Sequence, residues 1–232
     1  MPYISVESGA LTSEQKKELI ERLTAIASEI TNIPTQFFTV TIKELPDENF
    51  GIGGKSIDEI KRNYKPSLTL RLYQPTDANV ITTWLKSEYF MRQWCADRYE
   101  RFPVTPENMN SYHQQYIDGH NSVALTMVDS EEIVGYITLR TPADDSSEQR
   151  LGFVIVDDSK RGKGFGKALV SKAVDYAFSK LGAIKVSLGV FENNPAAIRC
   201  YESAGFHQVV KPETECYKCL GETWNCIEME RN

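Results

Sequence analysis

The chain has 232 residues, of which 41% are hydrophobic and 25% charged, with a formal net charge of −6 at pH 7. This composition is that of a globular protein with one large domain or two small ones. The acidic balance excludes a broad cationic surface for nucleic acid, and no apolar run approaches the roughly 18 residues of a membrane span. An odd cysteine count, five, and the lack of an export signal predict reduced thiols. We therefore expect a cytoplasmic protein with no nucleic-acid or membrane partner.

The first 62 residues predict a β–α–β unit with a tail. Residues 3–8 alternate as a short strand, and "TSEQ", from Thr12 to Gln15, is a capping box that opens a helix. Apolar residues recur at helical spacing until Pro34 ends that helix. A second strand, "QFFTVTIKEL", a glycine loop and a short helix follow. Because "NYKPS" has the composition of a short linker, we expect one domain over residues 1–64 and a second over 65–232.

The second part predicts a mixed α/β domain. We expect a strand at 68–73, a helix from about Thr76 to Leu85, an irregular aromatic stretch over 86–106, a helix at 106–117 and a β-hairpin over 122–140. The strand "RLGFVIVD", the helix after "KRGKGFG", the strand "IKVSLGVF", the helix "NPAAIRCYESA" and closing strands complete the chain. Strands and helices alternate without repeats, so the predicted fold class is α/β (α+β).

The segment "VDDSKRGKGFGKALV" predicts a phosphate site. Glycines at the start of a helix let backbone N–H groups approach a ligand closely, and such a cluster attracts phosphate. A Walker A loop requires G-x4-G-K-[ST], but only three residues separate Gly162 from Gly166, and Lys167 is followed by Ala168. A dinucleotide fingerprint requires G-x-G-x-x-G, and Gly162, Gly164 and Gly166 are one residue short. Neither of these phosphate loops fits.

A different pattern fits better. The run R-G-x-G-x-G, from Arg161 to Gly166, follows an apolar strand, and "NNPAAIRCYESAGF" comes further along the chain. Together the two motifs resemble the GNAT superfamily of acetyl-CoA-dependent N-acetyltransferases, over about residues 67–230. The resemblance implies direct transfer of acetyl from acetyl-CoA, the co-substrate, to a small amine or a peptide amine. In that family the pyrophosphate binds N–H groups at the helix start, and the pantetheine arm lies along the preceding strand.

The resemblance also implies the residues that bind the co-substrate and carry the chemistry. Tyr201 falls where many GNAT members keep a tyrosine near the CoA sulfur, a general acid for the leaving thiolate; a half-buried core tyrosine is the alternative. Glu148 lies near where several members place a base, and a structural carboxylate is the alternative. The implied cofactor-binding residues are Val154, Ile155, Val156, Arg161, Gly162, Lys163, Gly164, Phe165, Gly166, Lys167, Asn194, Ala197 and Tyr201.

The acceptor side is less defined. The aromatic stretch 88–103 is expected either to shape the acceptor pocket, with Trp94, Asp97 and Tyr99 as candidate contacts, or to form an aromatic core under a loop. For the whole domain the alternative to an enzyme is a non-catalytic acyl-CoA sensor.

The first domain carries a second resemblance. "MPYISVESG", "FFTVTIKEL" and "ENFGIGGKS" are similar to the 4-oxalocrotonate tautomerase family, over residues 2–62. The resemblance implies that Pro2, once the methionine before it is removed, is a secondary amine that shuttles a proton between carbon and oxygen. Phe50 would supply the apolar wall that lowers the pKa of this amine.

This copy departs from the family pattern at the substrate side. Ala10, Leu11 and Thr39 stand where many members carry arginines, so a dicarboxylate substrate is disfavoured. The family pairs such units into dimers and then trimers or hexamers. The alternative is therefore an inactive copy that serves as an oligomerisation module for several acetyltransferase domains.

Cysteine and histidine give weaker signals. Cys216, Cys219 and Cys226, with His207, could suggest zinc, but a hairpin with small buried thiols is the preferred interpretation, and no metal is expected. The histidine at 113, within a polar helix, is predicted to be a solvated surface residue.

Overall fold

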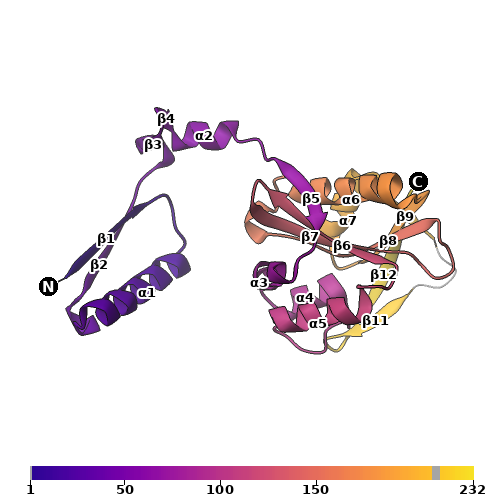
Figure 1. The fold of residues 1–232 in the computed structure, drawn as a ribbon, viewed down its shortest axis with the longest axis horizontal. Coiled ribbons are helices and arrows are strands. Elements are labelled where there is room, and N and C mark those ends of the chain that lie inside the picture. The colour runs from indigo at the N-terminus through magenta and orange to yellow at the C-terminus, as the bar shows by residue number, and fades with distance from the viewer. Residues whose placement is uncertain (1, 211–214) are drawn as a thin grey trace. The chain divides into compact units, whose positions relative to one another are not determined.

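The structure is a computed structural model that describes residues 2–210 and 215–232. The chain divides into two compact units, Met1–Lys65 and Pro66–Asn232, and the ribbon of each can be followed by colour in Figure 1. Within the described residues, no helix has both the length and the apolar character needed to cross a membrane.

The first unit is built on two parallel strands joined by one helix. β1 (Tyr3–Ser8) pairs with β2 (Thr39–Glu44), and α1 (Ser13–Thr31) connects them. The predicted capping box is confirmed, because the N–H of Gln15 donates to the Thr12 hydroxyl at 3.2 Å and the Thr12 N–H donates to the Gln15 side chain at 2.9 Å. The remaining elements are the 3₁₀ turns η1 (Thr35–Phe37) and η2 (Asp47–Asn49), the strands β3 (Gly51–Ile52) and β4 (Lys55–Ser56), and the helix α2 (Ile57–Asn63).

This unit leaves large apolar side chains in contact with solvent. Tyr3 is 63% exposed, and on α1 Ile20, Ile26 and Ile30 are 42%, 51% and 74% exposed. None of the described residues of this unit is buried. A single helix on two strands has too little surface to enclose a core of its own.

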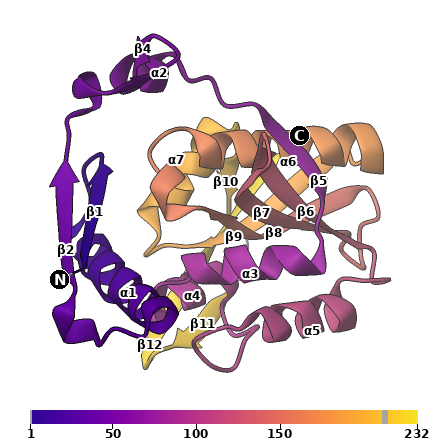
Figure 2. The same ribbon diagram turned by 60° about the vertical axis from the view of Figure 1, so that its left-hand side comes forward.

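The second unit is built around one mixed sheet (Figure 2). Its strand order is β10-β12-β9-β8-β7-β6-β5, with β11 added to β12, and only the β8–β9 neighbours run parallel. The strands are β5 (Leu68–Leu72), β6 (Ser122–Asp129), β7 (Glu132–Arg140), β8 (Glu148–Val156), β9 (Lys185–Phe191), β10 (His207–Val209), β11 (Cys216–Cys219) and β12 (Glu222–Arg231).

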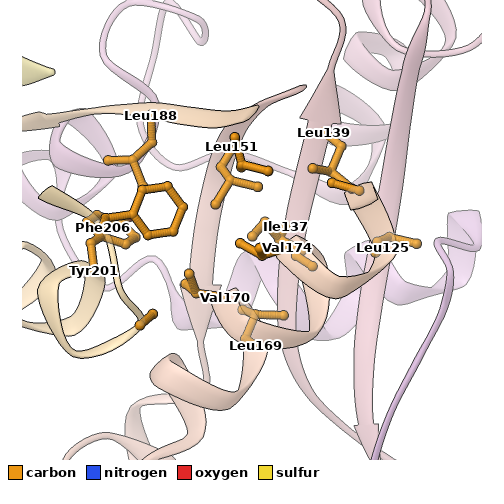
Figure 3. Packing of buried hydrophobic residues seen from close by; sticks show 14 of the residues in the cluster. Leu125, Ile137, Leu139, Leu151, Leu169, Val170, Val174, Leu188, Tyr201 and Phe206 are labelled. Carbon is orange, nitrogen blue, oxygen red and sulfur yellow. The ribbon is translucent and has the colours of Figure 1, made fainter. Parts of the chain in front are cut away.

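Helices cover both faces of this sheet, so the predicted mixed α/β class is confirmed. α6 (Phe165–Leu181) and α7 (Pro195–Ser203) lie on one face, and α3 (Ala78–Ile81), α4 (Glu88–Cys95) and α5 (Pro106–Tyr116) lie on the other (Figure 1). Each face has its own core. Figure 3 shows Val170 and Val174 of α6 packed against Ile137 and Leu151 of the sheet. The opposite core contains Met91, Met109, Tyr99 and Tyr136.

Two local predictions differ from the structure. Residues 86–106, expected to be irregular, contain α4, and that expectation was wrong. The Ser87 hydroxyl accepts from the Phe90 N–H at 3.2 Å, and Arg92 pairs with Glu88 one turn away at 3.0 Å, so the helix has both a cap and an internal ion pair. The helix expected from Thr76 to Leu85 is instead three short pieces: η3 (Pro75–Asp77), α3 and η4 (Thr82–Trp84).

Candidate active site

The two parallel strands of the sheet part in the middle of the domain. β8 and β9 are paired at Glu148–Lys185, Gln149–Val186 and Arg150–Ser187, and at no later position of the described strands. A cavity of about 490 Å³ lies beyond this point, lined by residues 151–154 of β8 and 188–191 of β9. The parting of two strands therefore opens a cleft in the sheet.

A β-bulge shapes the β8 wall of this cavity. The β7–β8 register shifts between Tyr136 and Thr138, and Phe153 has a φ of +51°. A positive φ is uncommon for a bulky residue, so nothing in the sequence indicates the bulge. The Phe153 ring packs on Trp94 and Tyr112, with ring centroids 5.1 and 5.3 Å away, and these contacts hold the bulged backbone in place.

The N-terminus of α6 presents a cluster of backbone donors. Gly162 and Gly164 have φ angles of +71° and +84°, which suit glycine, and a Cβ at either would meet open space. Such a cluster at the start of a 17-residue helix is suited to an anion. Within the described residues, no backbone carbonyl accepts from the N–H groups of Gly162, Gly164, Phe165, Gly166 or Lys167.

The other residues of the glycine run have separate tasks. Arg161 pairs with Asp158 at 2.8 Å and lies over the Phe90 ring, 4.3 Å from its centroid. A Cβ at Gly166 would lie 3.1 Å from the Cys200 sulfur, so this glycine also lets α6 and α7 approach closely. The remaining side chains divide by burial: Phe165 belongs to the core, while Lys163 and Lys167 are exposed.

Tyr201 of α7 lies between the core and the cavity. It lines the cavity, is only 8% exposed and packs beside Phe206 (Figure 3). Burial, with a smaller contribution from Cys200, raises the pKa of its phenol well above the ordinary value. Within the described residues the hydroxyl has no hydrogen-bond partner. The phenol is thus neutral at physiological pH and keeps its proton.

Asn194 and Ala197 begin the same helix and also line the cavity. The Asn194 side chain caps α7 by accepting from the Ala197 N–H at 3.2 Å, and the Asn194 N–H donates to the Phe191 carbonyl at 2.9 Å. The cap fixes the start of α7 at the end of β9, which sets the position of Tyr201 two turns later.

Glu148 lies at the closed end of the cleft. It does not line the cavity. Its carboxylate pairs with Lys185 at 2.6 Å and accepts a hydrogen bond from the Ser187 hydroxyl. Burial raises the pKa of this carboxyl, but the bonds from Lys185 and Ser187 outweigh burial, and the net pKa is lowered.

Of the three candidate acceptor contacts, the structure places only one in the cavity lining. Trp94 lines the cavity, and its buried indole N–H has no hydrogen-bond partner among the residues that the structure describes. Tyr99 is buried behind it, with the rings stacked 6.0 Å apart. Asp97 is exposed beside Arg98 at 3.7 Å and does not line the cavity.

Sequence reasoning missed most of the charged residues that line the cavity. Arg98, Arg140, Arg150, Glu215 and Tyr217 line the cavity, and they come from four separate parts of the chain. Their convergence depends on strand register, which no short motif encodes.

The cysteines form no zinc knuckle in the described residues. β11 and β12 form the predicted hairpin, and of its thiols Cys219 is buried whereas Cys216 is exposed. The one group of potential metal ligands that comes together among the described residues is Glu215, Cys226 and Glu228, and Arg150 already bonds both Glu228 oxygens, at 2.6 and 2.7 Å.

Comparisons with known proteins assign each unit to a family. Residues 81–206, more than half of the chain, match the acetyltransferase (GNAT) family, and residues 2–60 match the tautomerase enzyme family. The spermidine N(1)-acetyltransferase of Vibrio cholerae is 27% identical over 142 residues, which cover 60% of this chain and 78% of that protein. A probable tautomerase of Bacillus cereus is 38% identical over 60 residues, which cover 25% of this chain and 98% of that protein.

A solved structure agrees in fold. The crystal structure of the Vibrio cholerae spermidine N-acetyltransferase with CoA and spermine superposes with a TM-score of 0.60 at 22% identity, covering 71% of this chain and 94% of that one. Acetyl-CoA as co-substrate is what the family assignment requires. The chain thus belongs to the acetyltransferase (GNAT) family of acyltransferases and carries, at its N-terminus, a member of the tautomerase family.

Proposed function

We propose that the second unit transfers the acetyl group of acetyl-CoA to the nitrogen of an amine acceptor inside the β8–β9 cleft. One observation carries the proposal: beyond Arg150–Ser187 the two parallel strands part into a cavity that Tyr201 lines. The cleft offers room for a thioester between strand edges. The donor cluster at the start of α6 offers a site for the pyrophosphate without a metal.

The residues have distinct roles in this reaction. Backbone groups from Arg161 to Lys167 bind the pyrophosphate, and Val154, Ile155 and Val156 flank the pantetheine arm, with Asn194 at its side. The neutral amine attacks the thioester carbonyl, so that a C–N bond forms and the C–S bond breaks, and Tyr201 donates its proton to the leaving thiolate.

The amine must also lose a proton, and Glu148 is the sequence-based candidate for that base. It would need a water between itself and the cavity. Its lowered pKa and its pairing with Lys185 favour a structural role instead.

A pair of glycine variants tests the co-substrate site. Gly164 and Gly182 cap opposite ends of α6, both have a positive φ, and a Cβ at either meets open space. Valine at either position therefore strains the backbone to a similar degree. We expect Gly164→Val to abolish CoA binding in calorimetry while Gly182→Val retains it. Equal affinities in the two variants would contradict the assignment.

Thiol release distinguishes an enzyme from a sensor. An acetyltransferase releases CoA from acetyl-CoA when an acceptor amine is added, and a non-catalytic acyl-CoA sensor binds CoA but releases none with any amine. Tight CoA binding without amine-dependent release, across a broad amine set, would replace the proposed function with the sensor alternative.

A second activity is proposed for the first unit, because it spans almost the whole of a tautomerase relative. We infer that Pro2 transfers a proton between carbon and oxygen of an enol. The Pro2 carbonyl accepts from the Thr39 N–H at 3.1 Å, which ties the residue to the start of the β1–β2 sheet. The intact denatured mass tests the premise. A mass one methionine lower means that Pro2 has a free amine and should ketonise simple enols; a retained methionine leaves the unit as a scaffold.

The exposed apolar side chains of this unit support self-association. We propose that copies of the chain assemble through it, as dimers, trimers or hexamers, covering Ile26, Ile30 and their neighbours. Light scattering of the purified protein gives the number of copies, and a monomer would contradict this proposal. No disulfide links the cysteines of the described residues, which suits the cytoplasmic location that we propose.

A further inference from the structure

Two arginines face each other across neighbouring strands in the cavity wall. Arg140, the last residue of β7, is directly paired with Arg150 of β8, and both line the cavity. Directly opposed residues of adjacent strands point to the same face of a sheet, and like charges at such positions repel. Arg150 is neutralised by its two bonds to Glu228, at 2.6 and 2.7 Å. Arg140, within the described part of the chain, pairs with no carboxylate.

A third guanidinium lies on the same side. Arg98, from the segment between α4 and α5, lines the cavity, and its contact with exposed Asp97 is long, at 3.7 Å. Burial raises the pKa of Tyr112, whereas Arg98 and Arg140 both lower it. The two arginines are therefore both within electrostatic range of one phenol in the cavity wall.

The side chains that line the cavity, among the described residues, do not have the negative net charge that would attract a polycation. They include three arginines and one carboxylate, Glu215, which accepts from the Tyr217 hydroxyl at 2.7 Å. Even with Glu228 counted as the neutraliser of Arg150, two cations face one anion. A polyamine would meet net repulsion here, whereas a molecule with an anionic and a cationic end would find a partner for each.

We propose that the acetyl acceptor is an amine that also carries a carboxylate, and that this carboxylate binds Arg140, with Arg98 beside it. The inference rests on the proposed acetyl transfer and specifies its substrate class. A guanidinium presents a planar pair of donors that fits a carboxylate bidentately. The bound carboxylate offsets the Arg140–Arg150 repulsion, Glu215 attracts ammonium groups, and the reacting amine points to the parted strands.

Matched acceptors isolate the carboxylate. Lysine and cadaverine differ only in that group, as do ornithine and putrescine, histidine and histamine, and phenylalanine and phenethylamine. With acetyl-CoA at a fixed level, kcat/KM for CoA release is measured for both members of each pair. We expect the best carboxylated acceptor to exceed its partner by about 10- to 100-fold, the range for a charge-assisted bidentate contact.

Arginine variants test whether Arg140 causes the preference for carboxylated acceptors. Arg140→Gln should lower kcat/KM for the carboxylated acceptor by about 10-fold or more and change that for its partner less than threefold. Arg101→Gln, an exposed arginine that does not line the cavity, is the matched control and should change neither. Arg140→Gln also removes a like-charge contact, so the melting temperature of this variant should equal or exceed that of the wild type. Misfolding would then not explain the loss of kcat/KM.

The outcomes separate this inference from the proposed function. If amines without a carboxylate, spermidine included, are acetylated better than carboxylated amines, the inference is overturned and acetyl transfer is supported. An equal loss for both members of a pair in Arg140→Gln would also overturn it. A protein that binds CoA but acetylates no member of any pair overturns the inference, and it overturns the proposed function as well if no amine of a broader set releases CoA. A protein that does not bind CoA overturns the proposed function itself.

Discussion

The guanidinium of Arg150 crosses β9 to reach Glu228 of β12, and it passes directly over Gly189. A Cβ at Gly189 would lie 2.9 Å from an Arg150 nitrogen, 3.1 Å from a Glu228 oxygen and 2.7 Å from the Cys226 sulfur. The missing side chain on β9 therefore provides the space in which an ion pair joins two strands that are not neighbours.

Gly189→Ala should lower the free energy of unfolding by about 1–3 kcal/mol, because the added methyl group displaces these three side chains. Cys226→Ala removes the nearest of the three atoms. In a double-mutant cycle read by urea unfolding, the two substitutions should cost less together than the sum of their separate effects. Strict additivity would show that the crowding has no energetic consequence.

Tyr201→Phe should lower kcat about 10- to 100-fold and leave CoA affinity within about threefold, because only the proton donor is lost. Since the pKa of this phenol is raised, kcat of the wild type should show no alkaline decline from Tyr201 up to about pH 10, its ordinary value. Turnover and calorimetry on the same preparations give both numbers. Unchanged turnover would remove Tyr201 as the acid.

Glu148→Gln separates the two roles open to that carboxylate. Its folded pKa is depressed, so the stability that it provides is present above the ordinary glutamate pKa, about 4.3, and is lost as the pH falls below it. The variant should therefore lose less stability than the wild type between about pH 5 and pH 3.

Activity gives the other readout for this variant. We expect its kcat at neutral pH to stay within about threefold, as for an ion-pair residue. A loss of about 100-fold or more would instead identify Glu148 as the general base.

His113 should make the acetyltransferase unit sensitive to mild acid. Its side chain is buried, its Nε2 lies 2.6 Å from the Tyr136 hydroxyl, and burial lowers its pKa to about 4. The unfolded state, with an ordinary pKa of about 6.5, binds more protons between these values, so stability falls as the pH falls through that window.

The expected loss from pH 7 to pH 5 is about 2 kcal/mol, measured by urea unfolding at each pH. His113→Gln, which does not titrate, should abolish this loss, and His120→Gln, at an exposed histidine, should retain it. Equal stability of the wild type at both pH values would refute the attribution of acid sensitivity to buried His113.

Local chemistry made part of this structure predictable. The capping box at Thr12, the hairpin of β6 and β7 and the glycines that open α6 each follow from a short run of residues. The bulge at Phe153 has no such signal, because a phenylalanine does not favour a positive φ. His113 was misjudged for a related reason: its helix is polar, and the residue is buried by Tyr73, which follows β5, and by Tyr136 of β7.

The charged wall of the cavity shows the same limit more strongly. Arg150 and Glu228 are 78 residues apart in the chain. Arg140 opposes Arg150 only because the β7–β8 hairpin has one particular register, which includes a bulge. Sequence motifs could thus indicate a candidate acetyl-CoA site, through backbone groups at a glycine run, but not which side chains line the rest of the cavity.

The exposed isoleucines of α1 have a consequence for how the protein melts. If their burial depends on other copies of the chain, folding of the first unit obeys mass action, and dilution alone should loosen it. The second unit encloses its own cores, so its unfolding is expected not to depend on protein concentration. A thermal scan should then resolve two transitions, one that shifts upward as protein is added and one that stays fixed, so that a single melting temperature would describe neither unit.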